Sequence, residues 1–209
     1  MRRLSILCLF VLFIAFADAQ TAYVAEFQMR TYAPGSSIAS RVANGIEALR
    51  SDGSLVHITE WFSTAGGPLR FYEIVDLTKR QMVRTDPLTQ SKTTRYLSQA
   101  EVALYVAAAD GCKYASIAEA NPDMMSTRLG NRVVLTFTHD HAAQWVAPEL
   151  GCAVLESSVA WADGGHQERS VVKIASIEPG EEYFTVPDSF VERTAEQIDA
   201  IYRSKYGVR

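Results

Sequence analysis

The sequence lacks the motifs that usually mark an enzyme. It contains no Gly-x-Ser-x-Gly nucleophile elbow, no His-Glu-x-x-His zinc motif and no glycine-rich loop that could hold a phosphate. Its four histidines and many serines permit imagined triads that spacing alone cannot distinguish from chance. The adjacent carboxylates of Glu181 and Glu182 would point to opposite sides of an extended segment, which does not suit a glycosidase pair. Enzymatic function is therefore the less favoured interpretation, and we expect no cofactor.

The sequence also lacks clusters of one charge and long apolar runs beyond its N-terminal segment. The formal net charge is −4 at pH 7, and the two signs are mixed along the chain. No run of Lys and Arg indicates a nucleic-acid-binding surface. After residue 19, no apolar run approaches the about 20 residues that span a bilayer. We expect no nucleic-acid partner and no transmembrane segment in this part of the chain.

Residues 1–19 have the layout of a signal peptide. Two arginines, Arg2-Arg3, precede an apolar run over Leu4–Phe16, and Ala17–Ala19 matches the small-x-small pattern of a signal peptidase site. Cleavage would leave residues 20–209, which are enough for a single domain with one hydrophobic core. We therefore predict an exported protein of the periplasm or the cell exterior.

Cysteine is scarce, with three residues in the chain. Cys8 lies within the apolar part of the signal peptide and would be removed with it. The remaining cysteines, Cys112 and Cys152, most simply form a disulfide in an exported protein. This bond would close a loop of about 40 residues and contribute roughly 4 kcal/mol in the chain-entropy model. Two buried free thiols are the alternative.

Most of the remaining chain is typical of β-strands. Apolar and polar residues alternate over 23–30 and over 133–138, which predicts strands with one buried face. Three turn signals separate pairs of such runs, and they are Asp52-Gly53, Asp86-Pro87 and Asp163-Gly164-Gly165. We expect about nine or ten strands in hairpin succession, forming a mostly-β domain on a curved antiparallel sheet.

Several strands carry apolar residues on both faces. Leu55 and Trp61 share one side of their strand. Val56, Ile58 and Phe62 share the other side. A sheet with one solvated face would alternate more cleanly. The pattern indicates a sheet that curves around a core or cavity, or a sheet that is covered by helices.

Two helices are expected beside the sheet. Thr194 and Gln197 form a capping box in front of an amphipathic C-terminal segment. Ser98 and Glu101 form a second capping box in front of an alanine-rich run. A strand through 102–106 is the alternative for this second segment.

The tripeptide His139-Asp140-His141 is the best candidate for a metal site. If the preceding strand extends through it, His139 and His141 share a face and could chelate zinc or copper. His57 and His166 could supply further ligands. A polar turn is the favoured alternative, because a zinc site needs three or four ligands and only two are adjacent here.

Aromatic residues and methionines are well represented. Such side chains line adaptable apolar pockets, although they also fill ordinary cores. Together with the two-sided strands, they predict an enclosed site for an apolar, lipid-like ligand. The candidate lining residues are Phe27, Met29, Phe62, Phe71, Leu135, Phe137 and Trp161.

The C-terminal half resembles a group of uncharacterised secreted bacterial proteins. In that group a G-x-x-V strand leads to a W-x-x-P-x-x-G turn, a long hairpin and a closing F-x-V-P. The matching segments here are Gly130–Val133, Trp145–Gly151 and Phe184–Pro187. More distantly, the layout is similar to LolA/LolB-type lipoprotein carriers. This resemblance implies a half-barrel open on one side, helices over its mouth and an apolar cavity for acyl chains, and it implies no catalytic residue.

These observations favour an exported, non-enzymatic binding protein for an apolar ligand. One alternative is a protein–protein interaction module of the cell envelope, which would present a sheet edge or the C-terminal helix to its partner. A second alternative is a metal-binding or hydrolytic protein that uses His139 and His141.

Expression of the full chain with export should yield a protein that begins at Gln20 and carries no free thiol. N-terminal sequencing and intact mass after alkylation without reductant measure both properties. Alkylation of Cys112 and Cys152 in the exported protein would show that the disulfide is absent.

Overall fold

The structure is a computed structural model that describes residues 21–63, 67–109, 121–139, 141–150 and 153–206. The signal peptide, the three cysteines and Asp140 lie outside these residues. Export and the Cys112–Cys152 disulfide therefore stay predictions.

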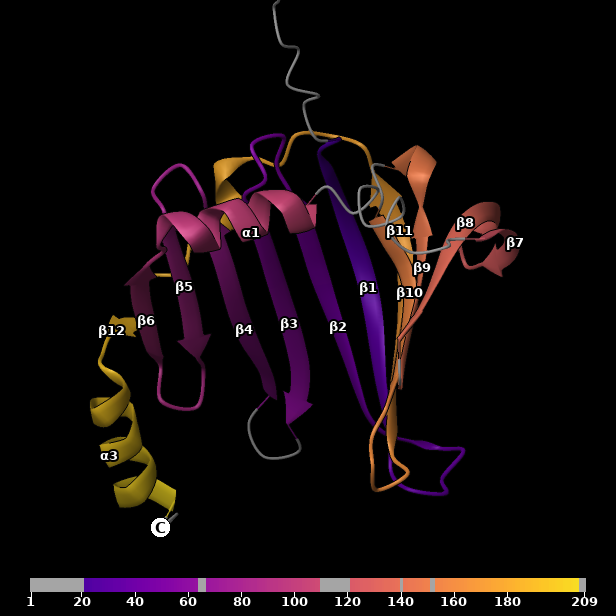
Figure 1. The fold of residues 1–209 in the computed structure, drawn as a ribbon. Coiled ribbons are helices and arrows are strands. Elements are labelled where there is room, and N and C mark those ends of the chain that lie inside the picture. Colours follow the sequence, from indigo (N-terminus) through magenta and orange to yellow (C-terminus); the bar gives the residue numbers. More distant parts are fainter. Residues whose placement is uncertain (1–20, 64–66, 110–120, 140, 151–152, 207–209) are drawn as a thin grey trace, which may run out of the picture.

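The described residues form one mostly antiparallel sheet of twelve strands, where we expected nine or ten. Figure 1 shows the ribbons of the central strands face-on and those on the right nearly edge-on, because the sheet bends between them. The mostly-β, curved-sheet prediction is confirmed. Across the sheet the order is β12 (Val191–Glu192), β6 (Ser91–Tyr96), β5 (Gln81–Asp86), β4 (Gly67–Asp76), β3 (Leu55–Ser63), β2 (Ala39–Leu49), β1 (Tyr23–Tyr32), β11 (His166–Ala175), β10 (Ala153–Ala160), β9 (Ala142–Ala147), β8 (Gly130–His139) and β7 (Asn121–Thr127).

Two pairings in this order join strands that are not consecutive in the sequence, so a succession of hairpins does not produce them. The first strand, β1, pairs with β11, so the N-terminal hairpins and the C-terminal strands become one sheet. The two-residue strand β12 returns from the C-terminal segment and pairs parallel with β6 at the sheet edge.

Aspartate side chains shape four of the hairpin turns. In each turn a carboxylate oxygen accepts a hydrogen bond from a backbone N–H two or three residues further on, at 2.7 to 2.9 Å. This local bond imitates a backbone turn and explains why Asp begins these segments. Gly53 and Gly164 complete two of the turns with φ of 86° and 87°, which a side chain would strain. The turns predicted from the sequence are confirmed, and the four aspartates are Asp52, Asp76, Asp86 and Asp163.

Both predicted capping boxes are present. At α1 (Gln99–Ala109), the Glu101 N–H donates to Ser98 Oγ at 3.2 Å, and the Ser98 N–H donates to Glu101 Oε2 at 2.9 Å. At α3 (Ala195–Tyr206), the Thr194 N–H donates to Gln197 Oε1 at 2.9 Å. The second helix is therefore confirmed over the alternative strand. No helix among the described residues is long and apolar enough to cross a membrane.

Different segments cover the two faces of the sheet. On one face, which we call the α1 face, Val102 and Tyr105 of α1 pack on a buried cluster from β4, β5 and the residues that follow β4 and β6. On the opposite face, which we call the outer face, Tyr183 and Phe184 of the 3-10 helix η2 (Glu181–Phe184) pack on β2 to β4. Apolar residues on both sides of a strand therefore have separate partners, as the sequence pattern indicated.

Gly45 allows the Phe27 ring to lie against β2. A Cβ at this position would overlap the Phe27 ring and lie 2.5 Å from the carbonyl oxygen of Ile58.

We expect Gly45→Ala to lower the free energy of unfolding by about 1–3 kcal/mol, because Phe27 is buried and cannot move without disturbing its neighbours. Urea denaturation measures this change. Phe27→Leu in the same background should recover part of the loss, and unchanged stability of Gly45→Ala would contradict the packing argument.

Candidate functional site

Cross-strand partners on the α1 face form four rows across β1 to β4. Apolar side chains dominate the first row, which lies closest to α1, and they also dominate the third and fourth rows. The second row carries acidic and basic side chains, and we call it the charged row. In order from α1, the rows are Tyr23, Leu49, Leu55 and Val75; then Ala25, Glu47, His57 and Glu73; then Phe27, Gly45, Thr59 and Phe71; then Met29, Ala43, Trp61 and Leu69.

Glu47 is the centre of a buried polar cluster in the charged row. Its residue surface is 7% exposed. The Tyr23 hydroxyl donates to Glu47 Oε1 at 2.5 Å. His57 Nε2 and Arg169 Nη2 each lie 2.9 Å from Glu47 Oε2. Four side chains from β1, β2, β3 and β11 therefore meet at one carboxylate.

The cluster holds Glu47 as a carboxylate. Burial alone would raise the pKa of Glu47, but the positive charge of Arg169 and hydrogen bonds from His57 and Tyr23 outweigh burial and lower it to about 2. Burial and the neighbouring carboxylate raise the pKa of Tyr23 well above its ordinary value, so this hydroxyl stays a donor. Glu47 is consequently a fixed anion near neutral pH and is poorly suited to exchange protons in catalysis.

Arg169 connects the cluster to the apolar rows. Its Nη1 donates to the carbonyl oxygen of Val154 at 3.0 Å, and its guanidinium lies 4.4 Å from the centroid of the Phe27 ring. Within the described residues, its buried Nε has no hydrogen-bond partner. The aromatic ring thus covers a guanidinium that is only partly satisfied by hydrogen bonds.

A cavity of about 400 Å³ opens on the sheet where the charged row meets the third row, and we call it the central cavity. Its volume lies within the range of about 300–1,000 Å³ that is common for small-molecule sites. The lining combines an aromatic ring with hydroxyl and charged groups. It is formed by His57, Thr59, Phe71, Tyr72, Glu73, Arg84 and Thr85.

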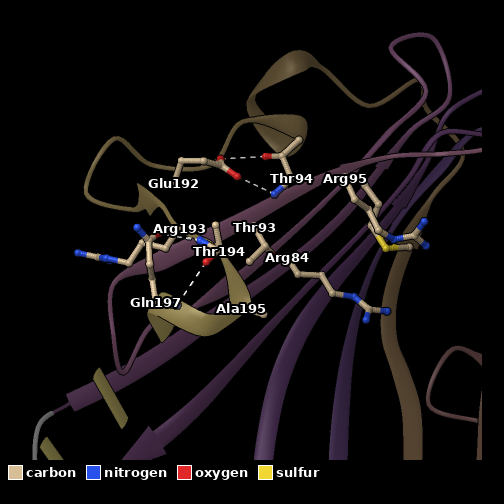
Figure 2. A pocket seen from close by; sticks show the side chains of 10 residues that line it. Arg84, Thr93, Thr94, Arg95, Glu192, Arg193, Thr194, Ala195 and Gln197 are labelled. Carbon is tan, nitrogen blue, oxygen red and sulfur yellow. Dashed lines mark hydrogen bonds between the residues drawn. The ribbon is translucent and has the colours of Figure 1, made fainter. Parts of the chain in front are cut away.

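A second cavity of about 540 Å³ lies between the edge of the sheet and the start of α3, and we call it the edge cavity. Figure 2 shows its lining side chains, with Glu192 accepting two hydrogen bonds from Thr94. Arg84 also lines the central cavity, so this side chain borders both the central cavity and the edge cavity. The lining residues are Met82, Arg84, Thr93, Thr94, Arg95, Glu192, Arg193, Thr194, Ala195 and Gln197.

The structure brings three of the predicted ligand-lining residues to the α1 face. Phe27 and Met29 lie on β1, and Phe71 lines the central cavity. Phe62 and Trp161 do not join them. Phe62 is 66% exposed on the outer face, and Trp161 is 42% exposed in the turn after β10. Leu135 and Phe137 belong to β8, but their side chains lie outside the described part.

The condition for the histidine metal site is not met. Strand β8 ends at His139, which pairs with Ala142 at the start of β9, so His139 and His141 do not follow one another along a strand. The other candidates have separate partners. His57 contacts Glu47, and His166 stacks on Tyr32 with ring centroids 4.3 Å apart. Among the described residues, no group of three or more His, Cys, Asp or Glu side chains could hold a metal ion.

Sequence reasoning missed Glu47, Arg169 and Arg84. Glu47 is the only charged residue between Ala43 and Leu49 of an otherwise largely apolar strand end, and this signal could have identified it. Its partner could not be found in this way, because Arg169 is 122 residues away in the sequence.

Comparison with known proteins gives a structural likeness alone. No protein-family model matches the chain, and no curated protein matches it. Among solved structures, the chain is similar to MucB in complex with MucA(peri), with a TM-score of 0.42 and 13% identity over 80% of this chain and 55% of that chain. It is also similar to a LolA superfamily protein from Nitrosomonas europaea, with a TM-score of 0.36 and 13% identity over 80% of this chain and 91% of that chain.

A LolA superfamily protein is thus among the structural neighbours. The chain spans little more than half of the MucB chain. At these TM-scores the likeness carries no functional argument.

Glu47→Gln should strongly destabilise the protein at neutral pH. The substitution keeps the volume of the side chain but leaves the buried Arg169 without its counter-charge, which typically costs about 3–5 kcal/mol. Chemical denaturation measures the change. The matched control is Glu60→Gln, which breaks a more exposed pair with Arg70 and should cost less than about 1 kcal/mol. Equal losses for the two variants would contradict the special role of Glu47.

The same variant should alter the acid dependence of stability. Folding lowers the pKa of Glu47 from 4.5 to about 2, so its contribution is complete above the unfolded pKa and is lost as the pH falls between these values. The wild-type protein should therefore lose stability more steeply than Glu47→Gln in this window. Asp76, whose pKa is also lowered to about 2, titrates in both proteins, so their difference isolates Glu47. Parallel pH profiles would contradict the assignment.

Proposed function

We propose that this protein is an exported, non-enzymatic binding protein that takes an apolar, lipid-like chain onto the α1 face. The observation that carries the proposal is the open position of the β3 and β4 part of the third and fourth rows, next to the central cavity. Phe71, Trp61 and Leu69 are only half-buried there, and none of them belongs to the apolar clusters of the described residues.

These side chains can supply the affinity that a lipid-like ligand requires. Completing the burial of one large apolar side chain contributes up to about 1.5–3 kcal/mol, and each buried methylene of a ligand adds about 0.8 kcal/mol. Several such contacts support dissociation constants near the micromolar range, about −8 kcal/mol. Adjacent positions on neighbouring strands allow one chain to contact all three residues.

The charged row limits where an apolar chain can lie. An alkyl chain that crossed Glu47 and His57 would remove charged and hydrogen-bonding groups from water without pairing them, which is costly. The chain therefore follows the third and fourth rows and keeps its apolar end away from the charged row. This arrangement favours a ligand that is apolar along most of its length and polar at one end.

Phe71→Ser should weaken the binding of the neutral fluorescent probe N-phenylnaphthylamine by about tenfold or more, because each 1.4 kcal/mol of lost contact is a factor of ten. Fluorescence titration of the mature, delipidated protein measures the affinity. Phe62→Ser is the matched control, because it removes the same ring from the outer face. Its affinity should equal that of the wild-type protein.

Native mass spectrometry of gently purified protein supplies an independent test. We expect lipid to co-purify with the wild-type protein and to be depleted in Phe71→Ser. An apo mass together with no probe binding would overturn the proposed function, and equal losses in Phe71→Ser and Phe62→Ser would overturn the assignment to the α1 face.

A further inference from the structure

Arg84 and Arg95 form a basic pair at the junction of the central and edge cavities. Arg84 pairs with Thr93 in the β5–β6 register, and Met82 pairs with Arg95, so both arginines belong to the α1 face and occupy neighbouring cross-strand positions. Figure 2 shows their guanidinium groups extending to the same side of the cavity. Arg84 shares the lining of the central cavity with Phe71.

The carboxylates that contact this pair are accessible to solvent. Arg84 Nε lies 3.0 Å from Glu73 Oε2, and Arg95 Nη1 lies 2.6 Å from Glu101 Oε1. Ion pairs between exposed side chains typically contribute less than about 1 kcal/mol. A ligand anion can therefore replace either carboxylate at little cost.

The other charged groups of the edge cavity have structural contacts. Arg193 Nη1 donates to the carbonyl oxygens of Thr89 and Gln90 and to Ser91 Oγ, which fixes the C-terminal segment to the sheet. Glu192 accepts from the N–H and the hydroxyl of Thr94. The basic pair is thus the part of this lining that remains suited to bind a ligand.

We propose that the ligand is an amphiphile with an anionic head group, which the basic pair Arg84 and Arg95 binds while its chain lies against Phe71. This inference rests on the proposed function and names the chemical class of its ligand. A guanidinium presents a planar fork of donors that matches a carboxylate or a phosphate. The position of Arg84 between the two cavities places the head group beside the charged row and the chain over the open apolar rows.

Four probes with the same dodecyl chain test the head group. Laurate and dodecyl phosphate are anionic, dodecyltrimethylammonium is cationic and dodecyl maltoside is neutral. Calorimetric titration of the mature protein below micelle formation should show the two anions binding at least about tenfold more tightly than the other probes. Their advantage should shrink as salt is added, because the arginines are exposed to screening. Comparison of laurate with dodecyl phosphate distinguishes a carboxylate from a phosphate head group.

Variants at the basic pair separate recognition from structural support. Arg84→Gln and Arg95→Gln should each lower laurate affinity, and the double variant should bind laurate no better than dodecyl maltoside. Glu73→Gln should raise laurate affinity, because it removes the carboxylate that competes for Arg84. If the Arg84–Glu73 pair only supported the fold, Glu73→Gln would weaken binding as Arg84→Gln does. Circular dichroism identifies any variant that fails to fold.

The outcomes distinguish this inference from the proposed function. Equal affinity for all four probes, or no effect in the double variant, would overturn the anionic head group and leave the apolar site intact. Binding of none of the probes would overturn both.

Discussion

The ion pair between Glu47 and Arg169 joins the two halves of the sheet. Glu47 belongs to β2 and Arg169 to β11, and β1 runs between them. A buried ion pair is costly to desolvate unless further groups complete it, and here Tyr23 and His57 complete the carboxylate while the carbonyl oxygen of Val154 and the Phe27 ring contact the guanidinium. A one-residue slip between β1 and β11 would move Arg169 to the outer face and remove its positive charge from Glu47. The ion pair therefore favours the observed register between β1 and β11, the two strands that join the halves of the sheet.

The same charged row divides the α1 face into two regions with different roles. On the side nearer α1, both Leu55 and the α1 residues pack on the buried cluster that contains Val75. On the other side of the charged row, the row that contains Phe71 is left partly accessible beside the central cavity. Because an apolar chain does not readily displace the hydrogen bonds of Glu47, the row that stabilises the fold also bounds the space that a ligand can use. The stability of the fold and the proposed binding site thus depend on one set of side chains.

The sequence predicted the features whose partners lie within a few residues. The turn at Asp52 and the capping box at Ser98 each depend on hydrogen bonds over two or three positions, so their residue types identify them directly. The pairing of β1 with β11 depends on contacts between distant segments, which no local pattern encodes. Trp161 illustrates the intermediate case. The sequence predicts it as a lining residue of an apolar site, but its backbone N–H donates to the carbonyl oxygen of Gly165 at 2.8 Å at the start of the turn.

Phe62 and Phe71 show why the candidate site was only partly predictable. Alternation already places Phe62 on the side of β3 opposite to Trp61, but it does not say which face a ligand would contact. The structure adds that Arg50 anchors η2, because its Nη2 lies 2.9 Å from Glu181 Oε1 and its guanidinium lies 3.8 Å from the centroid of the Phe184 ring. These contacts fix η2 over the outer face, where Phe184 packs with buried residues of β2, β3 and β4. The chain itself therefore completes that part of the outer face, and the proposed apolar site is assigned to the α1 face, where Phe71 lines the central cavity.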